Sequence, residues 1–257
     1  MSKFAEKLSQ ATRDIAPPMG FGAAAAARRG APMLLVADIT GAEAGLSAVK
    51  ELADAALLTV PHTIGLDEQL PPLARGLGGV PFGVWMESVP ASEIEDLAKL
   101  GCDFVVFGTV GTSSAIIKNE DMGKMLAVDP AMPDSMAGAV GDLELDAVAI
   151  KAPAEQTGIS VHRLLVYHRF SGLTQKPLMV PCPRELTSRD LEDLLDAGVY
   201  AVLVGVEEVG KAGLQQVREA IKQLPAAPKR RPTRTRALVP RVSGELPRHE
   251  EEEEEDQ

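Results

Sequence analysis

Polar or titratable side chains follow a series of short apolar segments in this sequence, and among them are groups that could do chemistry. Lys151 ends a Val-Ala-Ile-Lys run, and an amine held beside apolar walls can become a nucleophile toward a carbonyl carbon. Glu87 and Asp129 end two further apolar segments, where burial or like-charge crowding would fit a carboxyl group for acid/base work. We therefore predict Lys151, Glu87 and Asp129 as catalytic residues of a lyase-like enzyme that acts on a small carbonyl or carboxylate metabolite.

Carboxylates at the same kind of position support a second interpretation. Asp38, Glu87, Asp129 and Glu207, together with His62, would form an oxygen-rich set of ligands of the kind that Mg²⁺ or Mn²⁺ prefers. A metal held there could stabilise an enolate or bind a phosphorylated or dicarboxylic substrate, as in a metal-dependent lyase or hydrolase. The spacing matches no signature such as HExxH, so the amine-centred and the metal-centred interpretations both stay open.

The other candidate nucleophiles and ligands are expected to be structural. Cys182 stands between two prolines with no histidine close in sequence, and Cys102 follows a glycine, so both are predicted to be small buried residues. His162 and His168 are six residues apart, which is not the i, i+4 spacing of a metal pair on a helix. Trp85, the sole tryptophan, is expected in the core, or lining a pocket.

The elements that must position these residues follow a repeated pattern of an apolar run, a turn and a segment of helical periodicity. Continuous Val, Leu, Ile and Ala runs indicate strands buried on both faces, which is typical of a parallel sheet covered by helices. The clearest helical segments span 92–100, 188–197 and 209–224. The eight apolar runs span 33–39, 55–60, 81–86, 104–107, 125–128, 147–150, 177–180 and 200–204.

Eight such units in residues 31–225 predict an α/β fold of the (β/α)₈ TIM-barrel class. An open doubly wound sheet is the alternative, but the first apolar run lacks the GxGxxG fingerprint. Residues 1–30 should add an extra helix, at 2–14, and a loop that cap the barrel, while 111–123 leaves room for only one or two helical turns. In a barrel, the polar residues after the strands would meet at one end, where active sites lie.

Lys151 at the end of the sixth predicted strand resembles the class I aldolase superfamily of barrels, in which the Schiff-base lysine commonly closes that strand. The resemblance covers the architecture and this one position. It implies that Lys151 forms an imine with a carbonyl substrate and that Glu87 or Asp129, on flanking strands, serves as acid or base.

The segment 176–205 resembles the closing half of phosphate-binding and flavin-binding barrels, which grip phosphate with a Gly-rich backbone and a helix N-terminus. Here the seventh strand runs into Pro181-Cys182-Pro183-Arg184, and prolines lack the amide donors that such a site needs. Glu207 and Glu208 follow the eighth strand, where an anion would rest. FMN and phosphate are therefore not expected, although Arg184 would partly offset the two acids.

Composition excludes several classes of partner. The chain holds 37 Asp and Glu against 26 Lys and Arg, a formal net charge of −11 that disfavours nucleic acid and anionic membranes. The apolar runs are strand-length, no secretory signal precedes them, and two cysteines provide no disulfide framework. We expect a cytoplasmic protein with a small-molecule substrate, and the sequence leaves a homo-oligomer open.

Residues 226–257 differ in composition from the rest. They hold seven basic side chains followed by eight acidic ones, with almost nothing apolar, so we expect a disordered tail. The tail nearly cancels its own charge, which leaves a net charge of −10 on residues 1–225. A third hypothesis is thus a non-catalytic barrel that binds a protein partner through this tail, with 237–241 as its apolar contact.

Overall fold

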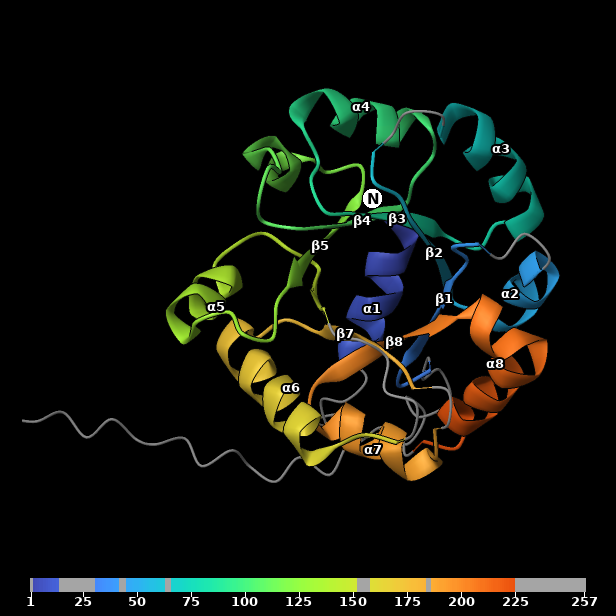
Figure 1. The fold of residues 1–257 in the computed structure, drawn as a ribbon, viewed down its shortest axis with the longest axis vertical. Coiled ribbons are helices and arrows are strands. Elements are labelled where there is room, and N and C mark those ends of the chain that lie inside the picture. Colours follow the sequence, from blue (N-terminus) through green and yellow to red (C-terminus); the bar gives the residue numbers. More distant parts are fainter. Residues whose placement is uncertain are drawn as a thin grey trace, which may run out of the picture.

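Eight short strands form a closed parallel barrel in which each strand pairs with the next and β8 pairs with β1 (Figure 1). The computed structural model describes residues 2–13, 31–41, 45–62, 66–151, 158–183 and 186–224. The predicted TIM-barrel class is correct. The strands are β1 Leu34–Asp38, β2 Ala55–Thr59, β3 Phe82–Met86, β4 Phe104–Phe107, β5 Gly123–Val128, β6 Ala147–Ile150, β7 Leu178–Pro181 and β8 Val199–Gly205.

Helices surround the barrel and cover its outer face (Figure 1). The outer side chains of the strands are mostly Val, Leu, Ile, Phe and Met, and burying them against the helices supplies the main hydrophobic stabilisation. The unit after β4 holds only a five-residue 3₁₀ helix, as its length predicts. The helices are α2 Leu46–Leu52, α3 Leu66–Leu77, α4 Ala91–Lys99, η3 Ser114–Lys118, α5 Asp134–Gly141, α6 Val161–Thr174, α7 Ser188–Asp196 and α8 Val206–Lys222.

The helix α1, Lys3–Arg13, lies across the end of the barrel at which the strands begin, here called the lower end (Figure 1). Asp103, just before β4, accepts hydrogen bonds from the Ser2 hydroxyl and from the backbone N–H groups of Lys3 and Phe4, at 2.8, 2.8 and 2.9 Å. These N–H groups have no partner within the helix, so the carboxylate caps α1 and docks it on the barrel. The predicted N-terminal helix is therefore present and closes this end.

Aspartates before two further strands also accept backbone hydrogen bonds at the lower end. Asp54 accepts from Leu35 N at 2.9 Å, and Asp146 accepts from Lys124 N at 2.7 Å. Arg218 of α8 binds Asp54 with both terminal nitrogens, at 2.9 and 3.0 Å. These three aspartates thus hold the first residues of strands and of α1 in place.

The strand register determines which side chains face the lumen of the barrel. The ring of Phe104 stacks on Phe4 of α1 with centroids 4.5 Å apart, so Phe104 faces inward. Phe104 pairs with Gly83 and Gly123, and side chains of paired or alternate residues share a face. The same alternation brings the following residues to the lumen at the ends of the strands: Asp38, Thr59, Trp85, Ala127, Ala149, Pro181, Leu203 and Gly205.

Some predictions concern residues outside the described ranges. These are the loop at 14–30, Arg184 and the tail at 226–257, and what the sequence predicts for them stays a prediction. Among the helices of the described ranges, none is both long and apolar enough to cross a membrane.

Candidate active site at the barrel mouth

Lys151 and Glu87 form an ion pair at the end of the barrel where the strands finish, here called the mouth. Each residue directly follows a strand, β6 for Lys151 and β3 for Glu87. The Lys151 Nζ donates a hydrogen bond to Glu87 Oε2. The lysine side chain is 32% exposed and the glutamate side chain 70% exposed, so both can be reached from solvent. The pair places an amine within direct proton-transfer distance of a carboxylate.

The contact crosses the mouth of the barrel. The sequence interpretation placed Glu87 on a strand flanking that of Lys151, and this is wrong: β3 and β6 are separated by β4 and β5. Asp129, after β5, is the flanking residue, yet Lys151 pairs with Glu87. In a closed barrel, residues after distant strands face one another over the lumen, and a lysine is long enough to span part of that distance.

Glu87 is held in place by the neighbouring strand end. A Cβ built on Gly108, after β4, would lie 2.5 Å from the Glu87 carbonyl oxygen and 3.4 Å from Oε2, so only glycine permits this close approach. Thr112 donates a hydrogen bond to the Gly108 carbonyl at 2.7 Å and accepts one from Val89 N at 3.1 Å. Through these two hydrogen bonds, the Thr112 hydroxyl links the segment after β3, which carries Glu87, to the end of β4.

Asp38 and Asp129 each cap their own turn. Asp38 Oδ1 accepts hydrogen bonds from the backbone N–H and the hydroxyl of Thr40, at 2.9 and 2.6 Å. Asp129 Oδ1 accepts from Ala131 N at 2.7 Å. One oxygen of each carboxylate is thus used locally, as is common for aspartate at a turn. Asp129 is exposed and Asp38 is half-buried.

The structure gives the metal hypothesis no support. In the described ranges, which include all five predicted ligands, no group of three or more His, Cys, Asp or Glu side chains is placed to hold a metal ion. Glu207, in the first turn of α8, instead lies against the turn after β1, with Oε2 2.9 Å from where a Cβ of Gly41 would be. His62, after β2, is exposed. The carboxylates therefore surround the mouth without converging on one point.

Both cysteines are buried, as predicted. Burial raises the pKa of the Cys102 thiol to about 12. Burial, and to a smaller extent the charge of Asp190, raises the pKa of the Cys182 thiol strongly. A thiolate is the nucleophilic form, so neither cysteine is equipped to attack a substrate at neutral pH. His162 and His168 are exposed on α6, as expected for helix surface residues.

Sequence reasoning missed Gly108 and the hydrogen bonds of Thr112. Trp85 faces the lumen one residue pair below the mouth and is half-buried, and Leu203 of β8 is half-buried on the same face. The run Gly-Thr-Val-Gly-Thr-Ser-Ser after β4 was a signal for a tight, hydroxyl-rich turn. It did not indicate which hydroxyl would bind the neighbouring strand end, because that depends on the register of β3 against β4.

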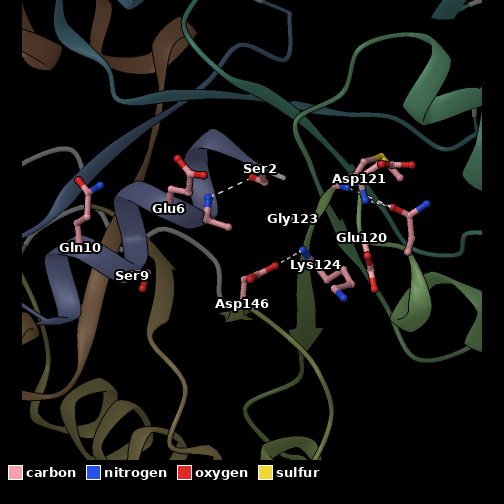
Figure 2. A pocket seen from close by; sticks show the side chains of 12 residues that line it. Ser2, Glu6, Ser9, Gln10, Glu120, Asp121, Gly123, Lys124 and Asp146 are labelled. Atoms are coloured by element: carbon pink, nitrogen blue, oxygen red, sulfur yellow. Dashed lines mark hydrogen bonds between the residues drawn. The ribbon is translucent and has the colours of Figure 1, made fainter.

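A pocket of about 720 Å³ lies at the other end of the molecule, between α1 and the segment leading into β5 (Figure 2). Its polar groups are largely occupied: Asp146 accepts from Lys124 N, and the Lys124 Nζ donates to the Ile117 carbonyl at 2.9 Å. None of the predicted catalytic residues lines it. The lower end of such barrels serves stability, whereas reactions take place at the mouth, so we place the candidate site at the mouth.

Comparison with solved structures agrees with this architecture. N-(5'-phosphoribosyl)anthranilate isomerase from Pyrococcus furiosus is 16% identical with a TM-score of 0.56, and the match covers 75% of this chain and 100% of that chain. A point mutant of the tryptophan synthase alpha-subunit from Pyrococcus furiosus is 14% identical with a TM-score of 0.56, covering 74% and 97%. The chain has the TIM-barrel fold. At this identity the similarity concerns the fold alone. No protein-family model and no curated protein sequence matches the chain.

Proposed function

We propose that this barrel is an enzyme of the lyase type in which Lys151 attacks a carbonyl substrate and Glu87 carries the proton. The observation that supports it is the hydrogen-bonded ion pair of these two side chains at the mouth, with the lysine partly buried. Barrel neighbours that are enzymes agree with a catalytic role. The alternative with a divalent metal lacks a converging ligand set in the described residues.

The chemistry follows from the positions of the two groups. A proton passes from the Lys151 ammonium to Glu87, and the free amine adds to the carbonyl carbon, which forms a C–N bond and breaks the C–O π bond. A proton then moves from the nitrogen to the oxygen, which becomes a hydroxyl. Glu87 then returns its proton to that hydroxyl, which leaves as water as the nitrogen lone pair forms the C=N bond of a protonated imine. The protonated imine can accept the electron pair of an adjacent C–C bond as it breaks.

Borohydride trapping tests the proposal. The protein is incubated with a panel of aldehydes and 2-keto acids, reduced, and mapped by peptide mass spectrometry. We expect a stable adduct on Lys151 that disappears in Lys151→Arg and persists in Lys99→Arg, because Lys99 lies on the outer helix α4 with a side chain 69% exposed. A folded protein that forms no adduct on Lys151 above the level seen on Lys99 would contradict the proposal.

A further inference from the structure

The charges around the mouth limit what kind of carbonyl compound could approach Lys151. The charge of Lys151 is already matched by Glu87, to which it is hydrogen-bonded. Three further carboxylates, those of Asp38, Asp129 and Glu207, lie at the same end of the barrel. Among the described residues, Lys151 is the only basic side chain that directly follows a strand at the mouth. Among the described residues that directly follow the strands, an anionic group on a substrate would thus meet net negative charge and no unmatched cation.

Three basic side chains on the surrounding helices are either ion-paired or buried. Lys211 of α8 forms an ion pair with Glu51 of α2 at 2.8 Å. Arg169 of α6 binds the carboxylate of Asp134 at 2.6 Å and also donates to backbone carbonyls of the loop after β5. Arg163 is buried on α6, in the layer outside the strands. These cations are therefore not arranged to receive an anion in the lumen.

The first turn of α8 carries carboxylates as well. A helix N-terminus is the usual place for a phosphate or carboxylate, because free N–H groups and the helix dipole both attract negative charge. Here Gly205 precedes a single helical turn that the non-helical Gly210 separates from the rest of α8, and Glu207 and Glu208 lie in this turn, both exposed. Their negative charges occupy the region that an anionic substrate group would need.

We infer that the site takes small carbonyl compounds that carry no anionic group, either neutral or cationic, and discriminates against phosphorylated and carboxylated ones. The inference rests on the proposed function, since it concerns substrates of Lys151. The half-buried Trp85 and Leu203 give the lumen below the ion pair an apolar surface for an uncharged part of the substrate. Trp85 would also suit a cationic group, which binds favourably to the face of an indole ring.

Three small aldehydes that differ in charge provide the test: neutral glycolaldehyde, anionic glyoxylate and cationic betaine aldehyde. Each is incubated with the full-length protein and cyanoborohydride at low salt, and adducts on Lys151 and Lys99 are quantified by mass spectrometry. The Lys151/Lys99 ratio corrects for the different intrinsic reactivity of the aldehydes. We expect this ratio to be about tenfold lower for glyoxylate than for the other two, and to approach theirs in high salt.

Charge-removing variants locate the cause. Asp38→Asn keeps the oxygen that binds Thr40, and Glu207→Gln keeps the size of the side chain, so the double variant should retain its structure. We expect the double variant to reduce, several-fold, the difference between the Lys151/Lys99 adduct ratios of glyoxylate and glycolaldehyde. The control is Glu192→Gln, which removes one exposed carboxylate on the outer helix α7. It should leave the difference between the two Lys151/Lys99 ratios unchanged.

The possible results separate this inference from the proposed function. If Lys151 is trapped but glyoxylate gives an equal or higher Lys151/Lys99 ratio, the selectivity for non-anionic substrates is refuted while imine formation stands. If no aldehyde is trapped on Lys151 above Lys99, both are refuted. If the selectivity is present but unchanged in the double variant, the carboxylates are not its cause, and the inference from their charge fails.

Discussion

Glu87 is the residue whose role is most open to direct measurement. Its carboxylate accepts the hydrogen bond from Lys151, and its side chain is 70% exposed to solvent. In the proposed reaction its carboxylate takes the proton that the amine must lose, and a side chain in that role contributes about 10²–10⁴-fold to rate. The proposed reaction therefore needs a side chain that can take up a proton as well as accept a hydrogen bond.

Replacing Glu87 with glutamine should slow the trapping of glycolaldehyde on Lys151 by about 10²-fold, because the amide still accepts a hydrogen bond but takes up no proton. The measurement is the rate of adduct formation between pH 6 and pH 10. We expect the rate of the variant to recover as the pH rises, since hydroxide and water then remove the proton. Glu95→Gln, on the exposed face of α4, is the control and should react as the unchanged protein does. An unchanged rate in Glu87→Gln would exclude the carboxylate as proton acceptor.

The cysteines yield a prediction with a defined pH direction. Burial raises the pKa of Cys102 from 9.0 to about 12, so the folded protein keeps a proton that the unfolded chain loses above pH 9. Stability due to this thiol is complete below pH 9 and falls by about 1.4 kcal/mol per pH unit between pH 9 and 12. The measurement is urea unfolding of the protein and of Cys102→Ala at pH 8 and pH 10.5. Between these two pH values, the free energy of unfolding should fall less in the variant than in the unchanged protein.

The reactivity of the two thiols at neutral pH tests whether both cysteines are buried. Both cysteines are buried, so a thiol reagent such as DTNB should react with neither until the protein unfolds. Rapid modification of Cys182 in the folded state would contradict its burial and indicate a reactive thiol after β7.

The turn after β4 contacts the segment that carries Glu87 and helps to hold it in place. Thr112 bridges the Gly108 carbonyl and Val89 N, and it adds to the backbone hydrogen bonds from Gly108 N to Met86 O and from Ser113 N to Val89 O that join the two adjacent strand ends. We regard Thr112 as a positioning residue for the ion pair.

Thr112→Val keeps the shape of the side chain but removes both hydrogen bonds, which leaves a partly buried donor and acceptor without partners. We expect trapping on Lys151 to slow by roughly tenfold, because small displacements of reacting groups are costly. Thr112→Ser retains the hydroxyl and should restore most of the rate. If Val and Ser variants lose trapping equally while their melting temperatures match that of the unchanged protein, the hydrogen bonds do not position Glu87.

The elements were largely predictable, and the contacts between them were not. The strands match their apolar runs because Val, Leu, Ile and Ala on both faces suit a sheet covered inside and out, and 111–123 is too short for a full helix. Lys151 and Glu87 were predictable as candidates because both follow strands. Their pairing was not, because β3 and β6 are distant in strand order and only the closure of the barrel brings their ends together.

In the whole molecule, the aspartates that hold backbone groups and the proposed catalytic pair lie at opposite ends of the barrel. The lower end contains Asp54, Asp103 and Asp146, each bound to backbone N–H groups, while the ion pair lies at the mouth. The Arg218–Asp54 pair, with each side chain 16% exposed, joins α8 to the start of β2. Changes at this pair should alter stability without altering reactivity.

Arg218→Met should lower the free energy of unfolding by about 3 kcal/mol, because it leaves the Asp54 carboxylate largely buried without its cation. Lys222→Met on the same helix removes an exposed pair, with side chains 62% and 53% exposed, and should cost less than about 1 kcal/mol. Urea unfolding measures both, and trapping on Lys151 below the transition should remain as in the unchanged protein. If both variants lose the same free energy of unfolding, the largely buried Arg218–Asp54 pair does not stabilise the fold more than the exposed pair does.

The pairing of β1 with β8 has a consequence for how the chain is made. During synthesis β1 emerges first, yet its partner β8 begins only at Val199, so one edge of β1 stays without a strand until most of the protein has been translated. An unpaired apolar edge can associate with other chains. Nascent chains that stop before β8 should therefore aggregate or recruit chaperones, whereas release of the last strand from the ribosome should end that exposure.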